Sequence, residues 1–131
     1  LKHVTDLFAG FFEWKERLVK EAYRDRFVTT IGGRQRHLDF RGADTWRVER
    51  QAVNSAIQGS AADITNGTME YVDERVMGVN MLAQVHDELV CEVVSVPDLK
   101  DLQYAGEHGH GFELSVPLVF EPKRVQNWSE K

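Results

Sequence analysis

The chain has 131 residues, of which 42% are apolar and 28% charged, and its formal net charge is −5. This composition is typical of one globular domain with its own core, and it excludes a disordered tail, a collagen-like repeat and a disulfide scaffold. The single cysteine, Cys91, indicates a reducing compartment, and the sequence shows neither a membrane span nor a signal peptide, so we expect a cytoplasmic protein. Because residue 1 is Leu rather than Met, we expect a fragment of a longer chain.

The first half of the chain predicts a helix followed by a hairpin. Residues 8–23 carry apolar side chains at helical spacing, and we expect the aromatic ones among them to be core. Residues 27–31 are β-branched and aromatic, residues 32–33 are a glycine pair typical of a tight turn, and residues 34–40 run back as a basic second arm. The aromatic residues expected in the core are Phe8, Phe11 and Phe12.

A long helix should follow this hairpin. Asp44 or Thr45 is a suitable cap, and the apolar pattern continues to about Arg75. Gly59 within that pattern costs about 1 kcal/mol relative to Ala, which indicates that something packs close to its backbone. Gly67 predicts a weak point or break in the helix.

The second half predicts a hairpin, a short helix and a last strand. Residues 79–85 and 89–96 are apolar and should form two buried strands on either side of three polar residues. We expect a helix over 99–105, a loop over 107–111 and a strand over 114–120. These elements together indicate one domain of the α+β class, in which antiparallel strands pack on long helices.

His86, Asp87 and Glu88 form the polar segment between the two apolar arms. Two adjacent carboxylates raise each other's pKa, and burying them unpaired is costly. A divalent cation removes both problems, and Mg²⁺ prefers carboxylate oxygens. An exposed turn with solvated acids is the simpler alternative, and the residues alone leave both open.

Arg50, Asn54 and Gln58 follow one another in steps of four, which keeps them near one helix face. Such a row of donors suits the acceptors of a nucleic-acid minor groove, although an ordinary polar helix surface is the more common explanation. Arg34 and Arg36 alternate along the hairpin and suit phosphate oxygens, but a solvated hairpin edge explains them equally well.

The remaining candidates for chemistry are histidines, a cysteine and a tryptophan. His108 and His110, with His86 elsewhere, invite a zinc site, but the pair lacks the helical spacing of the common zinc motif. Cys91 lies in an apolar strand and is expected to be core rather than a nucleophile. Trp46 fits either a core position or a base-stacking surface.

Together these segments resemble family A DNA polymerases, which include bacterial repair polymerases and several phage replicative enzymes. The matching segments follow the family's order and cover nearly the whole chain. They are the hairpin at 27–36, the palm helix containing Glu49 to Asn54 and Ile57 to Ile64, motif C at Gln84 to Val90, and the terminal segments Val116 to Leu118 and Asn127-Trp128. The resemblance implies the carboxyl-terminal part of a polymerase palm over residues 1–131.

The resemblance implies a role for each matching site residue. Asp87 is expected to bind the catalytic Mg²⁺ pair, with Glu88 supporting the same site and His86 at the primer terminus. Arg50, Asn54 and Gln58 are expected to contact the minor groove near that terminus, and Arg34 a backbone phosphate. The implied partners are primer-template DNA and deoxynucleoside triphosphates.

Two of the family's segments do not occur in this sequence. Motif A, with the other metal-binding carboxylate, and motif B, the fingers helix, are both missing, and Phe11 to Trp14 resemble the segment just downstream of the fingers helix. We therefore expect another polypeptide segment or a separate chain to supply them, and we do not expect this chain alone to polymerise DNA. A non-catalytic DNA-binding or assembly subunit that keeps the palm fold is the alternative function.

Overall fold

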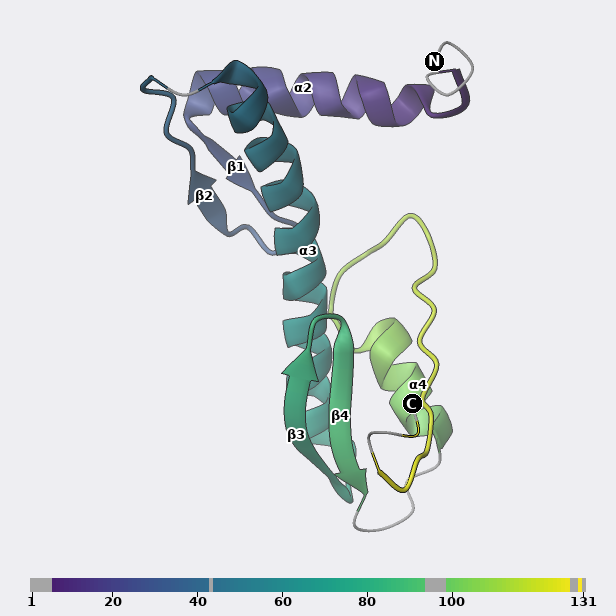
Figure 1. The fold of residues 1–131 in the computed structure, drawn as a ribbon. Helices are drawn as coiled ribbons and strands as arrows, with labels where there is room; N and C mark the ends of the chain where they lie inside the picture. Colours follow the sequence, from purple (N-terminus) through teal and green to yellow (C-terminus); the bar gives the residue numbers. More distant parts are fainter. Residues whose placement is uncertain (1–5, 43, 94–98, 128–129, 131) are drawn as a thin grey trace. The chain divides into compact units, whose positions relative to one another are not determined.

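A computed structural model describes residues 6–42, 44–93, 99–127 and 130. Helices alternate with two antiparallel hairpins, which confirms the α+β class (Figure 1). The packing forms two units, residues 1–61 and residues 62–131. In chain order the elements are α2 (Ala9–Asp25), β1 (Phe27–Thr29), β2 (Gln35–His37), α3 (Thr45–Arg75), β3 (Val79–Val85), β4 (Glu88–Val93) and α4 (Leu99–His108).

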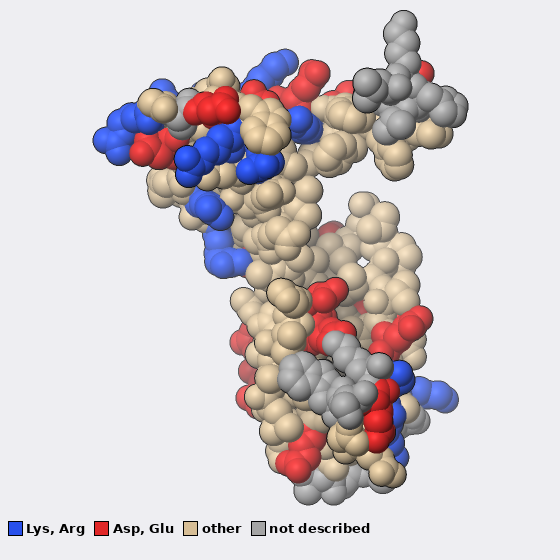
Figure 2. Space-filling view, viewed as in Figure 1, with Lys and Arg blue, Asp and Glu red and all other residues tan. Residues whose placement is uncertain are grey.

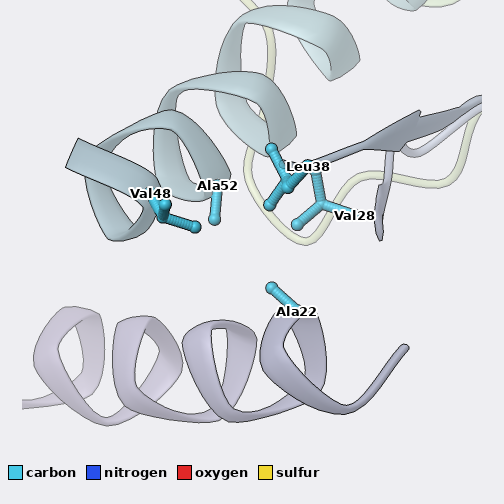
Figure 3. Close-up of a cluster of buried hydrophobic side chains, with 5 residues drawn as sticks. All are labelled: Ala22, Val28, Leu38, Val48 and Ala52. Carbon is cyan, nitrogen blue, oxygen red and sulfur yellow. The ribbon is translucent and has the colours of Figure 1, made fainter. Parts of the chain in front are cut away.

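The first unit is built around a small apolar core. The core is supplied by the carboxyl-terminal part of α2, by β1, by the residue after β2 and by the first turns of α3 (Figure 3). Leu18 and Phe40 pack against it and are partly buried. The buried core residues are Ala22, Val28, Leu38, Val48 and Ala52.

The expectation that the aromatic residues at the start of α2 belong to the core is wrong. Phe8, Phe11 and Phe12 are 59%, 44% and 37% exposed, and the Phe11 ring contacts Phe12 and Trp14 rather than the core. The core of this unit uses only the end of α2 near Ala22. Helical spacing correctly predicted an apolar face but not which part of that face is covered.

Local contacts explain where α2 ends and α3 begins. Arg26 takes a left-handed conformation (φ 67°) and donates its backbone N–H to the Ala22 carbonyl, which ends α2. Asp44 is the amino-terminal cap of α3, since its carboxylate accepts the N–H of Trp46 at 3.1 Å and its carbonyl accepts the N–H of Arg47. The predicted start and end of this long helix are confirmed.

The first hairpin is fastened to α3 at Gly59, and the predicted close approach there is confirmed. A Cβ on Gly59 would overlap the Thr30 methyl group. The next residue, Ser60, accepts the Ile31 N–H at 2.9 Å through its hydroxyl oxygen. Arg34 donates from its guanidinium to the Gly59 carbonyl at 3.0 Å. Glycine is needed at this position because the turn of the hairpin lies directly on the helix backbone.

The second unit packs β3, β4 and α4 on the carboxyl-terminal part of α3. Val72, Val76 and Ala105 form its buried core. The expectation that both strands of the hairpin are buried is wrong, because their residues are half-buried or exposed. This sheet has two strands and one covered face, so side chains such as Leu82, 64% exposed, face away from the core. The expected strand residues 94–96 lie outside the described residues.

Gly67 does not break α3, contrary to the prediction. The helix continues through it to Arg75, and a Cβ there would lie 2.5 Å from the His110 carbonyl oxygen. The glycine therefore serves a close approach between the helix and the chain that follows α4. Isolated helix propensity cannot distinguish this role from that of a helix breaker.

The strand predicted over 114–120 does not form, and α4 runs to His108 instead of ending at Ala105. Phe120 packs its ring on Gly106 and donates its N–H to the Glu107 carboxylate at 3.4 Å. This segment therefore packs against a helix, and none of the described strands pairs with it. An alternating pattern alone does not produce a strand, because the backbone N–H and C=O groups of a strand need a neighbouring strand to pair with.

None of the helices that the structure describes is both long enough and apolar enough to cross a membrane. The resemblance at Asn127-Trp128 falls partly outside the described residues, because Trp128 is not among them.

Candidate active site and nucleic-acid interface

The β3–β4 hairpin turns through two residues, His86 and Asp87. Val85 pairs with Glu88 across the hairpin, so Glu88 is the first residue of β4 rather than part of the turn. His86 has a positive φ of 59°, a conformation in which His is enriched relative to most residues other than Gly. Gln84 donates its side-chain amide to the His86 carbonyl at 3.2 Å, which supports the turn from the strand below.

The two adjacent carboxylates at the hairpin tip differ in exposure. Asp87 is exposed and Glu88 is half-buried. Within the described residues, no group of three or more His, Cys, Asp or Glu side chains is arranged to hold a metal ion. Asp87 and Glu88 do provide the oxygen ligands that Mg²⁺ prefers. The chemistry of the two side chains therefore fits Mg²⁺ as part of a ligand set.

The predicted row on α3 lies on an exposed face of the first unit. Arg50, Asn54 and Gln58 are all exposed. The buried residues of the same helix segment, Val48 and Ala52, lie two positions before Arg50 and Asn54. A shift of two residues corresponds to about 200° around an α-helix, so the row faces away from the core. This exposure makes the row available to a ligand.

A contact that involves the first residue of this row was not predicted from the sequence. The Arg50 guanidinium lies over the Trp46 ring, 4.5 Å from its centroid. Trp46 is 62% exposed, which rules out a core position within the described structure. The signal was present in the sequence as an aromatic residue four positions before an arginine on a helix.

Arg34 is placed beside the helix that carries this row. Its guanidinium donates to the carbonyl of Gly59, the residue after Gln58, while its side chain remains exposed. The arginine therefore joins the hairpin to α3.

Basic side chains gather around this region. Figure 2 shows Lys and Arg over β1, β2 and the beginning of α3 in the first unit, whereas Asp and Glu predominate on the visible face of the second unit. The visible surface therefore differs in charge between the two units. Basic side chains over β1, β2 and the beginning of α3 favour a polyanionic ligand for the first unit.

The histidines considered for zinc have other contacts. The His108 ring stacks on Tyr104, with centroids 4.6 Å apart. His110 is buried, accepts the Phe112 N–H at Nδ1 and lies 3.1 Å from the Glu107 carbonyl at Nε2. A neutral ring with its proton on Nε2 satisfies both bonds of His110, which indicates a structural role.

Cys91 is half-buried in β4, opposite Met81, and burial raises the pKa of its thiol. A raised pKa means that less thiolate is present at neutral pH, which argues against a nucleophile.

We expect iodoacetamide to alkylate Cys91 more slowly in the folded protein than in urea at pH 8, because unfolding restores the ordinary pKa. Equal rates, measured by mass spectrometry, would contradict this assignment.

Comparison with known proteins settles the family. The sequence model of DNA polymerase family A matches residues 2–130. The chain belongs to DNA polymerase family A. This confirms the resemblance from which the site residues were predicted.

The relatives of this family A chain are much longer proteins. It is 34% identical to the DNA polymerase I of Lactococcus lactis over 94% of the chain, and 30% identical to that of Treponema pallidum over 95%. It spans 15% and 13% of these two relatives. The structure is similar to the POL domain of Pol1 from M. smegmatis, solved in complex with DNA primer-template and dNTP. The TM-score is 0.73, the sequences are 35% identical, and the match covers 87% of this chain and 22% of that one.

Proposed function

We propose that this chain contributes part of the active site of a DNA-directed DNA polymerase, as the carboxyl-terminal part of its palm over residues 1–131. The observation that carries the proposal is the exposed two-residue turn with Asp87 at its tip, in a chain of polymerase family A. Support comes from the similar POL domain, which was solved with DNA primer-template and dNTP. By analogy, the partners of this chain are the same two classes of ligand.

The proposed catalytic group is the carboxylate of Asp87. Asp87 would bind the Mg²⁺ pair, Glu88 would support the same site, and His86 would contact the primer terminus. When bound, Mg²⁺ supplies charge that stabilises the attacking and leaving oxygens of nucleotidyl transfer. A two-residue turn on a regular hairpin suits this role, because it holds Asp87 in a defined place while leaving the carboxylate accessible.

The proposed nucleic-acid interface is the exposed row on α3. Arg50, Asn54 and Gln58 would donate hydrogen bonds to minor-groove acceptors, which occupy similar positions in every correct base pair. Arg34, held beside the row by its bond to Gly59, would contact a backbone phosphate. The basic side chains over β1, β2 and the beginning of α3 support this assignment (Figure 2).

The site requires a contribution from outside this chain. The described residues do not supply a complete metal-ligand set, and motifs A and B do not occur in the sequence. We infer that a further polypeptide segment or a separate chain supplies the second carboxylate and the nucleotide-handling helix, and that this chain alone is inactive. A cytoplasmic location, which for a phage-encoded member is the host cytoplasm, remains a prediction.

The decisive experiment removes the Asp87 carboxylate and measures Mg²⁺-dependent primer extension by the natural polypeptide or assembly that carries this segment. Loss of extension with retained DNA binding supports a catalytic role. Extension that is unchanged without this carboxylate would exclude it and favour the alternative, a non-catalytic DNA-binding or assembly subunit.

The row on α3 makes a separate prediction. Replacing Gln58 by Ala should weaken primer-template affinity by about three- to tenfold, because one or two hydrogen bonds to DNA are lost. Fluorescence anisotropy with a labelled duplex measures the affinity. Asn80→Ala is the matched control, because it also removes an exposed amide but lies on β3 rather than on α3. If the parent and Gln58→Ala bind primer-template DNA with equal affinity, Gln58 is not part of the interface.

A further inference from the structure

Trp46 extends the row on α3 by one more step of four residues. Its side chain is 62% exposed although Trp is a large apolar residue, and the Arg50 guanidinium covers one face of the ring at 4.5 Å. An exposed indole loses the hydrophobic benefit of burial, so its place here is not explained by the packing of the unit. The contact that it does make is with the first polar residue of the row.

The geometry of α3 keeps this pair on the side away from the core. Val48 is 2% exposed and lies two residues after Trp46, just as the buried Ala52 lies two residues after Arg50. Both pairs are spaced by four residues, so Trp46 and Arg50 stay on the side of the helix opposite to the buried Val48 and Ala52. The Trp46–Arg50 pair is therefore continuous with the exposed face that carries Asn54.

The backbone that carries Trp46 is held independently of its side chain. The Asp44 carboxylate accepts the backbone N–H of Trp46 at 3.1 Å as the cap of α3. Replacing the indole therefore leaves the capping bond in place. The ring stands on the first, fixed turn of the helix, which makes it a stable support for a long and flexible arginine side chain.

We propose that Trp46 is a positioning residue that holds the Arg50 guanidinium for its contact with duplex DNA. The proposal rests on the proposed function of the row. Stacking on the ring restricts the rotamers of Arg50 before DNA arrives, so less conformational entropy is lost on binding. Because a cation–π contact uses the charge of the guanidinium and not its N–H donors, Arg50 can keep this contact while it donates to DNA.

The test measures primer-template affinity and steady-state extension in the natural polypeptide or assembly that carries this segment. The variants are Trp46→Ala, Trp46→Phe, Arg50→Ala and the double variant Trp46→Ala/Arg50→Ala. We expect Trp46→Ala to weaken DNA affinity by about two- to fivefold with little change in kcat, the range typical of an exposed cation–π contact. Trp46→Phe keeps an aromatic face and should restore most of the affinity.

The double variant separates positioning from direct contact. Because Trp46 acts through Arg50, removing the indole should have almost no further effect once Arg50 is Ala. Two results would overturn the role of Trp46 while leaving the proposed interface intact. One is that Trp46→Ala lowers DNA affinity equally whether residue 50 is Arg or Ala. The other is that Trp46→Ala leaves DNA affinity unchanged although Arg50→Ala weakens it. If Arg50→Ala itself leaves DNA affinity unchanged, the proposed interface fails and the role of Trp46 fails with it.

Discussion

Primer extension is expected to fall by at least about a thousandfold when Asp87 is replaced by Asn in the natural polypeptide or assembly that carries this segment. Asn has nearly the shape of Asp but no negative charge, so the turn between β3 and β4 should persist. Charge stabilisation by a bound cation contributes several kcal/mol to such reactions, and each 1.4 kcal/mol or so corresponds to a factor of ten. The measurement is single-turnover extension of a labelled primer at saturating Mg²⁺.

A matched control and a second readout make this test specific. Glu92 lies at the other end of β4 and is exposed, so Glu92→Gln removes the same charge from the same hairpin and should leave extension unchanged. Binding of Mn²⁺, followed by electron paramagnetic resonance, should decrease for Asp87→Asn but not for the control. If Asp87→Asn extends primers and binds Mn²⁺ as well as the parent does, Asp87 is not a ligand of the metal site.

Gly67→Ala is expected to destabilise the second unit by up to about 2 kcal/mol, although Ala is the better helix former. A Cβ at this position meets the backbone of His110, with 2.5 Å to its carbonyl oxygen. A backbone group cannot rotate away as a side chain can, so the helix or the segment after α4 has to shift. Overpacking of this kind typically costs about 1–3 kcal/mol, which exceeds the gain of up to about 1 kcal/mol in helix propensity.

Amide hydrogen exchange along the carboxyl-terminal part of α3 measures this effect as faster exchange, about tenfold for 1.4 kcal/mol. Gly10→Ala is the matched control, because Gly10 lies in α2 and a Cβ there meets no atom within 4 Å. That substitution should slow exchange in α2 instead. If both variants stabilise their helices equally, the close approach at Gly67 does not exist in solution.

Sequence patterns predicted the helices and both hairpins well, and they predicted the packing poorly. The limits of α3 from Thr45 to Arg75 followed from a cap and a periodic pattern. Phe8 and Phe11 were wrongly expected in the core, since periodicity does not reveal how far a partner element extends along a helix. The alternating residues 114–120 were wrongly expected to pair as a strand, since the same pattern also suits an extended segment packed on a helix.

In the candidate site, too, the local features could be predicted from the sequence and the contacts between distant segments could not. Neighbouring residues were sufficient to predict the polar tip with Asp87 and the spacing of Arg50, Asn54 and Gln58, because turn chemistry and helical periodicity act over a few positions. They were not sufficient to show that Arg34 binds the Gly59 carbonyl.

Contacts between distant segments determined the rest of the molecule. They made Gly67 a site of close approach rather than a break in the helix, and the way α3 packs against its core turned the row of Arg50, Asn54 and Gln58 outward. Such contacts depend on which surfaces meet once the chain has folded, and a one-dimensional pattern records that an apolar face exists without recording what will cover it. Covering one side of α3 with the first hairpin and α2 is what leaves the opposite side exposed for the proposed contact with DNA.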